Sequence, residues 1–579
     1  MSVRWFGGRG TGHTDVRYPA RARALASDIG AAWLCGAWPG SQVATAQRPG
    51  RTVTILGRAR CEPEVLQRWV RHGVPDSAPT ALAGAYTIVE VTEHATVVFT
   101  DPGWIQPIYT AATTDGAPLW GSSSLALACL VGADVDDTWL HEHLHPGPGV
   151  EPGTGERSAF AGITPVPPGA RLTITSSEIT IRPLATATSA VSPRPAESLR
   201  AALQDTVAGV AEGRTGAAVA ADCSGGMDST SLAMLLAHHR PCGGSAAAGV
   251  VAVTVHPVGI TSGGDLDYAR AAIDYARTGR VQSLEHLLCA LGDGHVPYGR
   301  MDELVPATDE PAPSTIAIAR FDAELAMLAG RGIGDLVTGD GGDTLLGPQP
   351  GYLPDLAATA TVRAQAELVR HALGWARLRR TAVWPLLTQA RAAAVRGERG
   401  EAARTRAAMR VVARTARADA QITEQLHGIS LHNPFTDPRV VDAALVVPGP
   451  LRAGPGDYKP LLRRAMAGLL PETVTARRTK GDFTPDQYRG LRRHLQALTG
   501  LVDGELAARG LIDPIRYRAL LTRAAAGAPG IGFHQLNPVV AAEVWMRALR
   551  QAPAAARWAS ATEDPSARAS TRHRSEVSR

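Results

Sequence analysis

Lysine is almost absent from the sequence. Of its 59 lysine and arginine residues, only Lys459 and Lys480 are lysines. A general bias towards arginine accounts for the arginine excess. Because an ammonium is a compact point charge and a guanidinium is a planar fork, a retained lysine can mark a position that arginine does not suit. We interpret Lys459 as a chance survivor on the surface, and Lys480, which lies in a basic loop described below, as a site residue.

Long apolar runs and paired cysteines are also absent. No run approaches the ~18 apolar residues of a membrane span, and the N-terminus has no apolar signal core. The six cysteines form no CxxC pair, which is typical of free thiols in a reducing compartment. The net charge of +5 is modest for 579 residues and does not favour nucleic-acid binding. The sequence therefore predicts a cytoplasmic protein with neither a membrane nor a nucleic acid as partner.

The composition predicts a globular chain of two or more domains. Hydrophobic residues make up 45% and charged residues 20%, which suits buried cores, and 579 residues exceed the usual size of one domain. Residues 1–185 predict a β-rich sandwich because short strand-like segments alternate with turns. The clearest of these segments are 53–56, 85–91, 95–100 and 170–174.

The second part of the chain has a different pattern. Residues 186–196 are polar and predict a linker. Over residues 197–550, apolar strands such as 249–255 alternate with alanine-rich helical segments, which indicates a parallel α/β sheet, and a mainly helical extension follows residue 355. Residues 551–579 are rich in arginine, serine and alanine and predict a disordered tail. The predicted fold class is therefore α/β.

The strongest motif is a glycine-rich loop between an apolar run and a helix. It contains Ser224, Gly225, Gly226, Asp228 and Ser229. The two glycines let the backbone turn sharply, and the serine hydroxyls and the first helix amides can bind an anion. Asp228 would hold Mg²⁺ against a phosphate. Because the chain has no GxxxxGK[ST] sequence, we interpret this as a pyrophosphate-binding loop of an enzyme that cleaves ATP between its α and β phosphates.

A second acidic loop follows another strand-like run, residues 333–337. It contains Gly339, Asp340 and Asp343. Loops at the carboxyl ends of parallel strands meet at one edge of the sheet, so Asp343 and Asp228 could converge on one Mg²⁺. The alternative is a solvated glycine-rich turn.

Two further charged segments complete the candidate site. Asp309 and Glu310 precede a predicted helix, and they either contact substrate or metal or are simply acidic residues near a helix N-terminus. The basic loop 477–483 contains Lys480 and could stabilise charge growing on the α-phosphate. The alternative for this loop is a solvated basic turn.

Taken in order, these motifs resemble the class B asparagine synthetase superfamily. The loop at 224–229 resembles its SGGxDS loop, 339–343 its GEGxD loop, 433–437 its PFxD segment, and 459–483 its K-x-LLR-A and R-x-K-x-x-F stretch. The first half is similar to the family's glutaminase half at 101–103, 107–109 and 121–124. The resemblance implies a glutaminase-like domain of the N-terminal-nucleophile type. An adenine-nucleotide α-hydrolase (PP-loop) synthetase domain would follow it and use ATP and Mg²⁺.

The resemblance also implies roles for single residues. Asp228 and Asp343 match the Mg²⁺-pyrophosphate aspartates, and Lys480 matches the lysine that stabilises the adenylation and amide-forming transition states. The nucleotide-binding positions are Ser224, Gly225, Gly226, Asp228, Ser229 and Gly339. Asp340 stands where asparagine synthetases have glutamate and β-lactam synthetases have tyrosine, a residue tied to proton removal from the amine. Aspartate can act as a base, but its shorter reach changes the geometry, so Asp419 is an alternative partner.

The N-terminus departs from the family pattern. The family's glutaminases use a cysteine directly after the initiator methionine, whereas this chain has Ser2 there and no cysteine before Cys35. A serine hydroxyl is a poor nucleophile unless a base activates it. We therefore expect a degenerate glutaminase-like domain that is retained as structure.

Without ammonia from glutamine, the attacking nitrogen must be an amine of the substrate. Two branches of the superfamily are similar in this respect, the β-lactam synthetases and the lasso peptide macrolactam cyclases. Three features favour a cyclase: the length, the arginine- and alanine-rich composition and the helical section at 355–430. The albusnodin-like group is the subgroup of cyclases to which it would belong. The substrate would be a precursor peptide, and a leader protease and a leader-recognition protein would be further partners.

The sequence leaves two alternatives to a peptide cyclase. One is a β-lactam or asparagine-type synthetase that acts on a small molecule, and the other is a non-catalytic nucleotide-binding scaffold for a leader protease. It also leaves open the peptide, the ring size, the choice between an aspartate and a glutamate acceptor, and the oligomeric state.

Overall fold

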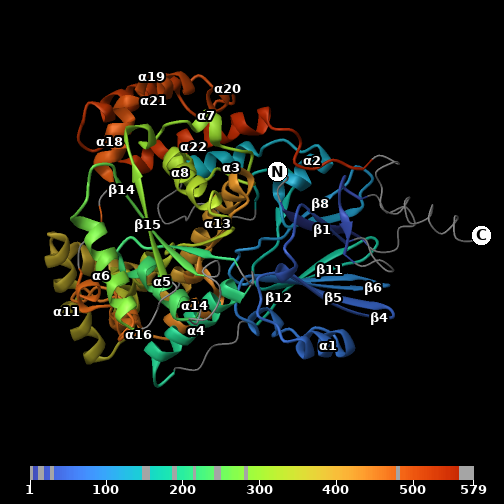
Figure 1. Cartoon of the computed structure of the whole chain (residues 1–579), viewed down its shortest axis with the longest axis horizontal. Coiled ribbons are helices and arrows are strands. Elements are labelled where there is room, and N and C mark those ends of the chain that lie inside the picture. The colour runs from blue at the N-terminus through green and yellow to red at the C-terminus, as the bar shows by residue number, and fades with distance from the viewer. Residues whose placement is uncertain are drawn as a thin grey trace, which may run out of the picture.

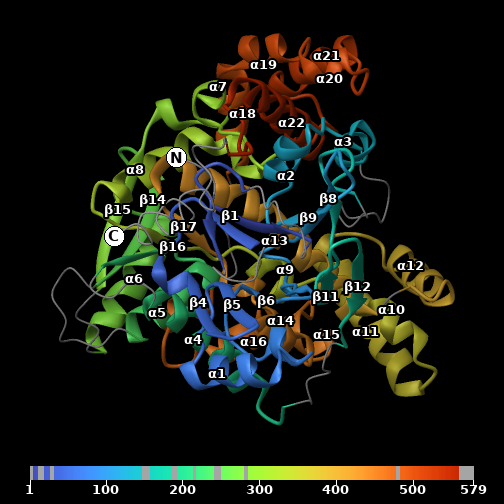
Figure 2. The ribbon, with the colours of Figure 1, turned by 90° about the vertical axis from the view of Figure 1, so that its right-hand side faces the viewer.

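The computed structural model describes most of the chain as two packed halves (Figure 1). The largely blue N-terminal half lies beside the green-to-red C-terminal half, and helices surround the latter (Figure 2). The described residues are 4–10, 18–25, 32–145, 157–185, 192–212, 217–239, 249–279, 284–398, 400–477, 481 and 483–559.

The N-terminal half contains two six-stranded antiparallel sheets. The first has the order β10 (Thr164–Pro165), β8 (Tyr109–Ala112), β9 (Pro118–Gly121), β1 (Trp5–Arg9), β3 (Ala32–Cys35) and β2 (Arg23–Ala24). The second has the order β12 (Ile179–Pro183), β11 (Ala170–Ile174), β7 (Thr96–Phe99), β6 (Tyr86–Thr92), β5 (Arg51–Gly57) and β4 (Val43–Arg48). The strands predicted at 53–56, 85–91, 95–100 and 170–174 are confirmed as β5, β6, β7 and β11.

The two sheets form a sandwich that helices cover on both outer faces. On β6, Val89 and Val91 point into the core between the sheets, whereas Ile88 packs under helix α1 (Pro63–His72). Helices α2 (Ser124–Val131) and α3 (Asp137–Leu144) pack in the core cluster on the outer side of the first sheet. Side chains of a strand alternate between faces, so burial on both faces explains why these strands are apolar at nearly every position.

The C-terminal half is built on a five-stranded parallel sheet. Its order is β15 (Leu284–Leu291), β14 (Val250–Pro257), β13 (Val219–Asp222), β16 (Asp335–Val337) and β17 (Ser430–His432). The main helices that pack on it are α4 (Pro195–Glu212), α5 (Met227–His239), α6 (Gly264–Thr278), α8 (Ile318–Ala329) and α13 (Glu401–His427). The predicted α/β class is confirmed, with continuous apolar strands of the kind that a doubly covered parallel sheet requires.

The topology places two loops side by side at one edge of this sheet. Strand β13 lies between β14 and β16, and all the strands run in the same direction. The loop after β13 carries the glycine-rich motif, and the loop after β16 carries the second acidic motif. The two motifs therefore emerge from neighbouring strands at the carboxyl edge, which is where ligands bind in open α/β sheets.

The remaining segments form helical layers, as expected after residue 355. Helices α10 (Leu353–Ala358), α11 (Val362–Arg379) and α12 (Val383–Val395) pack around Trp375 and form a lobe at the edge of the molecule (Figure 2). The final helices include α16 (Pro460–Ala465), α18 (Thr484–Arg493), α21 (Pro514–Ala525) and α22 (Phe533–Gln551).

Polar contacts fasten the two halves to each other. Buried Asp335 of β16 is ion-paired with Arg58 of the N-terminal half, and Asp437 accepts a hydrogen bond of 2.8 Å from the amide of Gly84. Asp309 accepts hydrogen bonds from the Ser123 hydroxyl at 2.6 Å and from the Leu125 amide at 3.0 Å, at the start of α2. The interpretation of Asp309 as a substrate or metal contact is therefore wrong, because its carboxylate caps a helix of the other half.

Two predicted boundaries need correction. Part of the predicted linker, 186–191, lies outside the described residues, and α4 already begins at Pro195. The predicted disordered tail begins too early: the carbonyl of Arg557 accepts a hydrogen bond from Ala20, and the Trp558 indole donates one to the carbonyl of Leu130. The large apolar ring of Trp558, which packs against the N-terminal core, explains why this segment is ordered. Residues 560–579 lie outside the described residues.

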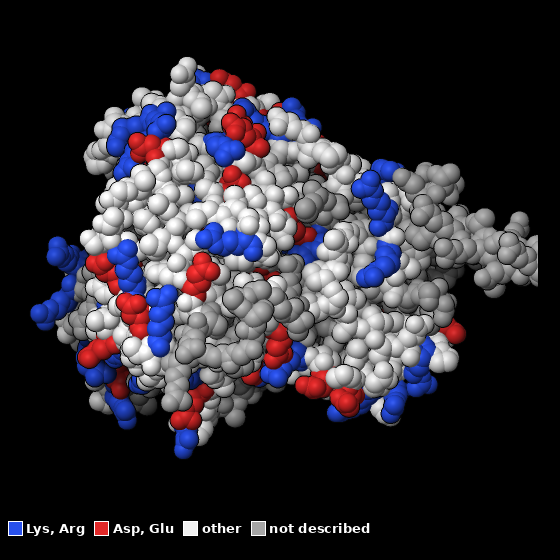
Figure 3. Space-filling view, in the orientation of Figure 1, with Lys and Arg blue, Asp and Glu red and all other residues white. Residues whose placement is uncertain are grey.

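The surface and the helices show two general features. On the face in Figure 3, basic and acidic side chains are interspersed, in agreement with the modest net charge. Among the described helices, none is both long enough and apolar enough to cross a membrane.

Candidate active site

A cavity of about 290 Å³ lies at the carboxyl edge of the parallel sheet. The loops after β13 and β16 form much of its wall, and β14, α8 and the segment from Tyr458 to Phe483 contribute the rest. Among the predicted site residues, the cavity is lined by Ser224, Gly226, Asp228, Ser229, Gly339, Asp340 and Asp343. The structure therefore brings together the two loops that the sequence predicted to converge.

The first loop has the form of an anion site at a helix N-terminus. Helix α5 begins at Met227, so the Asp228 and Ser229 side chains lie in its first turn. The Ser224 and Ser229 hydroxyls are 2.9 Å apart, and the Ser224 hydroxyl accepts a bond of 3.3 Å from the amide of Gly226. Hydroxyl donors and the positive end of a helix at one point favour a phosphate group.

Glycine is required where this loop makes close approaches. Gly225 has φ +70°, and a Cβ there would lie 2.6 Å from the carbonyl oxygen of Asp265 on α6. A Cβ on Gly339 would lie 2.6 Å from the amide nitrogen of Ser229. These distances are shorter than any ordinary contact, so the glycines allow the two loops and α6 to close around one point.

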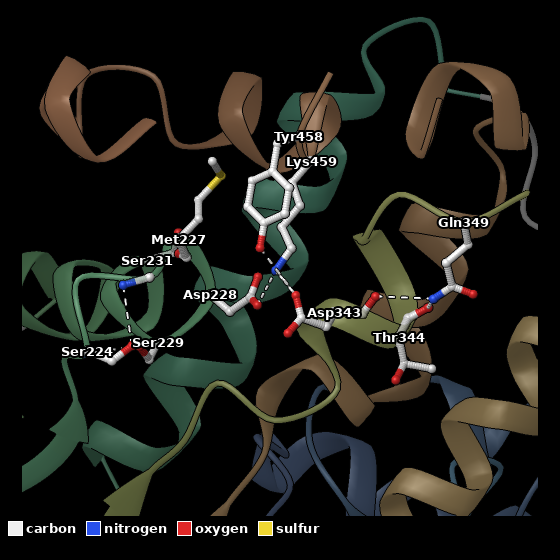
Figure 4. Close-up of polar contacts among 11 residues, drawn as sticks. Ser224, Met227, Asp228, Ser229, Ser231, Asp343, Thr344, Gln349, Tyr458 and Lys459 are labelled. Carbon is white, nitrogen blue, oxygen red and sulfur yellow. Dashed lines mark hydrogen bonds and ion pairs between the residues drawn. The ribbon is translucent and has the colours of Figure 1, made fainter. Parts of the chain in front are cut away.

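Lys459 lies between the two predicted metal aspartates (Figure 4). Its Nζ is ion-paired with Asp228 and lies 2.6 Å from the Asp343 carboxylate, with the side chain only 1% exposed. The Tyr458 hydroxyl points to the same place and donates to Asp343 at 3.4 Å. The prediction that Lys459 is a surface residue is therefore wrong, because the two carboxylates compensate the buried ammonium.

The electrostatics of Lys459 follow from this arrangement. Burial alone would lower the pKa of Lys459, but the charges of Asp228 and Asp343 outweigh it and raise the pKa, so the ammonium stays charged. Lys459 also has φ +48° directly before Pro460, a left-handed conformation that is unfavourable for a residue with a Cβ. Such backbone strain often accompanies functional sites.

Asp340 lines the cavity, whereas Asp419, the alternative base, does not. The Asn433 amide donates to the Asp340 carboxylate at 3.3 Å. Burial is the main cause that raises the pKa of Asp419 to about 6, with a further contribution from the charge of Asp340, and the Ser314 amide donates to Asp419 at 3.1 Å. Asp419 is therefore close enough to Asp340 for the two charges to interact.

Lys480 lies outside the described residues, so its role remains a prediction. Its described neighbours Arg477, Gly481 and Phe483 line the cavity. Arg477 is ion-paired with Asp265 and lies over the Tyr268 ring, with its guanidinium carbon 4.2 Å from the ring centroid. The basic loop therefore borders the cavity on both sides of Lys480.

Besides the buried Lys459, sequence reasoning missed several residues that line the cavity, three of which are polar residues close to the motifs or to the sheet. These are Tyr458, Asp222 at the end of β13, and Glu324 on α8. The signal for Asp222 was a carboxylate closing an otherwise apolar strand. Nothing in the sequence marked Glu324 as a cavity residue, because single acidic residues are common on helices and their surroundings are known only in the folded chain.

The donor chemistry of the site fits Mg²⁺. Asp228 and Asp343 converge on one point at which a cation, the Lys459 ammonium, already lies. One or two carboxylates with phosphate oxygens form the ligand set that Mg²⁺ prefers in nucleotide enzymes. Among the described residues, no group of three or more histidine, cysteine or acidic side chains could hold a metal by itself.

The fold and the site together define a nucleotide-binding α/β domain with a phosphate loop at the carboxyl edge of its sheet. A comparison with protein families matches asparagine synthase over residues 198–547. This match covers more than half of the chain, which therefore belongs to the asparagine synthase family. The protein is an ATP-dependent carbon–nitrogen ligase of the asparagine synthetase type.

Comparisons with individual proteins add little to this assignment. No curated protein sequence matches the chain. One similar solved structure is described as the allosteric regulatory enzyme of purine biosynthesis, with 12% identity, a TM-score of 0.19, and coverage of 50% of this chain and 75% of that one. Another is the glutamine phosphoribosylpyrophosphate amidotransferase of B. subtilis complexed with ADP and GMP, with 12% identity, a TM-score of 0.21, and coverage of 61% and 77%. These TM-scores are too low to carry an argument.

Proposed function

We propose that the protein is an ATP-dependent peptide macrolactam synthetase of the lasso peptide cyclase type. ATP adenylates an aspartate or glutamate side chain of a precursor peptide and releases pyrophosphate. The N-terminal amine of the same peptide then attacks the acyl-adenylate, which gives an isopeptide ring and AMP. The observation that carries the adenylation step is the convergence of Asp228, Asp343 and Lys459 beside the Ser224–Ser229 hydroxyl pair.

The phosphate side of the site is assigned to these residues. The pyrophosphate would lie on the first loop, where the serine hydroxyls and the start of α5 bind it. Asp228 and Asp343 would hold Mg²⁺, which when bound neutralises charge on the departing pyrophosphate. Lys459 compensates part of the charge of the two aspartates and would contact the phosphates beside them.

The amine side of the site is assigned to Asp340 and Asp419. The attacking amine must lose a proton, and a carboxylate with a pKa of about 6 can accept one near neutral pH. Asn433 orients Asp340 through its hydrogen bond. Lys480 is proposed as the cation that stabilises charge on the α-phosphate in both transition states.

The proposal of an intramolecular amine rests on the N-terminal half. Ser2, which lies outside the described residues, replaces the cysteine that glutaminases of this family require. The N-terminal half nevertheless packs firmly on the synthetase half through Arg58–Asp335 and the Asp309 cap of α2. These contacts support a structural role for it. Joining two ends of one bound peptide also gains rate from proximity.

The first prediction concerns the products. The enzyme, supplied with α-labelled ATP and a candidate precursor peptide, is expected to form AMP and pyrophosphate. Asp228→Asn and Asp343→Asn should each raise the barrier by several kcal/mol, because each removes charge that holds the metal and the pyrophosphate. Chromatography of the labelled nucleotide checks the result.

Each other outcome decides against a stated part of the proposal. ADP with free phosphate would exclude adenylation. AMP formed with a free amino acid but not with the peptide would favour a small-molecule synthetase. ATP binding without turnover would favour a scaffold for a leader protease. The Arg463→Ala variant, which removes an exposed ion pair with Asp457, is the matched control and should retain turnover.

The second prediction concerns glutamine. Ser2→Ala is expected to leave ATP turnover and the product unchanged, because a serine hydroxyl is a poor nucleophile unless a base activates it. The assay measures glutamate released from glutamine and AMP released with the peptide, in parallel. Glutamate release that disappears in Ser2→Ala would show a working glutaminase. It would contradict the proposal that the attacking amine belongs to the bound peptide.

A further inference from the structure

Helix α11 carries an apolar stripe on its exposed side. The stripe consists of Val362, Ala366, Val369 and Leu373, and the three larger side chains are 87%, 40% and 53% exposed in that order. Residues spaced by four, three and four positions lie on one face of an α-helix, so the stripe is continuous over about three turns. None of the four residues belongs to an apolar core cluster of the described part of the chain.

The opposite side of α11 holds the helix in its lobe. Leu368 and Trp375 pack there with residues of α10 and α12. The Trp375 indole donates to the Tyr352 hydroxyl at 2.9 Å, and that hydroxyl lies 2.8 Å from Nδ1 of His371. The lobe lies at the edge of the molecule, with space beside it for a partner (Figure 2). The fold therefore does not use the exposed stripe, and uncovered apolar surface of this kind often marks an interaction site.

The spacing of the stripe indicates the shape of the partner. Steps of four, three and four place these side chains at the a and d positions of a heptad, which form the narrow seam between two paired helices. A helix that lies on a membrane instead carries Trp, Phe or Leu on a large apolar face. The stripe contains only one leucine, two valines and an alanine. It therefore suits the side chains of one neighbouring helix better than a lipid surface.

A row of arginines borders the stripe on one flank. Arg363, Arg370 and Arg377 are exposed and follow one another at intervals of seven residues, which keeps them on the same side of the seam. Arg363 forms an exposed ion pair with Glu367 at 3.4 Å, whereas Arg370 and Arg377 have no ion pair with a described residue. Charges that flank a helix seam select a partner of opposite charge. The arginine row is therefore complementary to carboxylate side chains.

We infer that the exposed face of α11 docks an acidic amphipathic α-helix of a partner protein. Apolar residues of the partner helix pack on the stripe, and its carboxylates face the arginine row. A second copy of this chain fits less well, because in a two-fold symmetric antiparallel pair of α11 helices arginine would lie beside arginine. The inference goes beyond the proposed function and does not depend on it, since neither the stripe nor the arginine row lines the cavity described above.

A fluorescently labelled helical peptide tests the inference on the full chain. The probe is three repeats of the heptad EIAALEQ, which puts isoleucine and leucine at the a and d positions and glutamate on both flanks. Fluorescence anisotropy at low salt is expected to give a Kd of roughly 10–100 μM, because small interfaces are typically weak. The same peptide with lysine in place of every glutamate should bind about tenfold more weakly or worse, because it brings like charges to the arginine row.

Variants of α11 separate the stripe from the arginine row. Leu373→Asp puts a charge into the seam and should weaken binding of the acidic peptide by about tenfold or more. Arg370→Gln combined with Arg377→Gln should weaken it by roughly three- to tenfold and remove most of its salt dependence. Leu378→Asp is the matched control, because Leu378 is 56% exposed on another side of the same helix, and it should bind the peptide as the wild type does. All these side chains are exposed, so every variant should keep the wild-type melting temperature within a few degrees.

Four results would overturn the inference. The first two are no binding of the acidic peptide by the wild type, and equal binding of the acidic and basic peptides. The third is a wild-type dimer in sedimentation velocity that dissociates in Leu373→Asp, which would make a second copy the occupant. The fourth is binding of phosphatidylglycerol vesicles that is lost in Leu373→Asp, which would make the face a membrane site. None of these measurements involves ATP, so the proposed function stands or fails separately.

Discussion

Lys459→Ala is expected to destabilise the protein by roughly 3 kcal/mol and to abolish ATP turnover. The substitution leaves Asp228 and Asp343 facing one point without a cation. Breaking a buried ion pair typically costs 3–5 kcal/mol, and we expect the lower end because the Asp343 side chain is 47% exposed and water screens part of the repulsion. Urea unfolding followed by circular dichroism at pH 7 measures the free energy of unfolding.

A cation from solution should partly replace the lost ammonium. Millimolar Mg²⁺ is expected to raise the melting temperature of Lys459→Ala more than that of the wild type, in which Lys459 already lies between the carboxylates. Arg463→Ala, on the next turn of α16, should change the free energy of unfolding by no more than about 0.5 kcal/mol, because its ion pair is exposed. If the free energy of unfolding of Lys459→Ala lay within about 1 kcal/mol of the wild-type value and ATP turnover were normal, the proposed role of the Lys459 ion pairs with Asp228 and Asp343 would be contradicted.

Arginine is a poor substitute at this position, contrary to the expectation for a surface lysine. The Lys459 side chain is 1% exposed and its Nζ lies 5.1 Å from the centroid of the Tyr458 ring. A guanidinium is wider than an ammonium and would have to displace Tyr458 or one of the carboxylates. The scarcity of lysine was therefore a signal at Lys459, where the sequence interpretation had rejected it, and at Lys480 it stays a prediction.

The sequence predicted the elements of this fold well because local patterns encode them. Apolar runs such as that of β14 and the glycines of the two loops determine strands and turns whatever surrounds them. The convergence of the two loops could also be predicted, because neighbouring parallel strands end at the same edge of a sheet.

The contacts between distant segments could not be predicted in this way. Lys459 and Asp228 are separated by 231 positions, and no pattern around Lys459 shows that its side chain turns inward from the start of α16. The role of Asp309 stayed open between two interpretations for the same reason, since its partners Ser123 and Leu125 belong to the other half of the chain. Burial of a charge depends on these long-range partners, so it becomes visible only in the folded chain.

Lys480→Ala and Lys480→Arg are both expected to lower kcat by roughly 100- to 1000-fold. The proposed role is to donate to the α-phosphate as charge develops there, and losing one such donor costs about 2.7–4 kcal/mol in comparable sites. The planar guanidinium of arginine would place its donors away from that position. Stopped-time assays of AMP formation at saturating ATP measure kcat, and calorimetry measures ATP binding.

Substitutions of the two lysines should have different effects, which makes their proposed roles testable. A contact that strengthens in the transition state affects kcat rather than ATP binding, so Lys480 variants should keep the wild-type melting temperature and ATP affinity. Lys459 variants should lose stability as well, because their cation holds two carboxylates together in the resting protein. A Lys480→Arg enzyme within about threefold of wild-type kcat would leave Lys480 a generic basic residue. The stabilising cation would then have to be sought among the described basic residues of the cavity, of which Arg477 is held by Asp265 and Arg320 lies over the Phe483 ring.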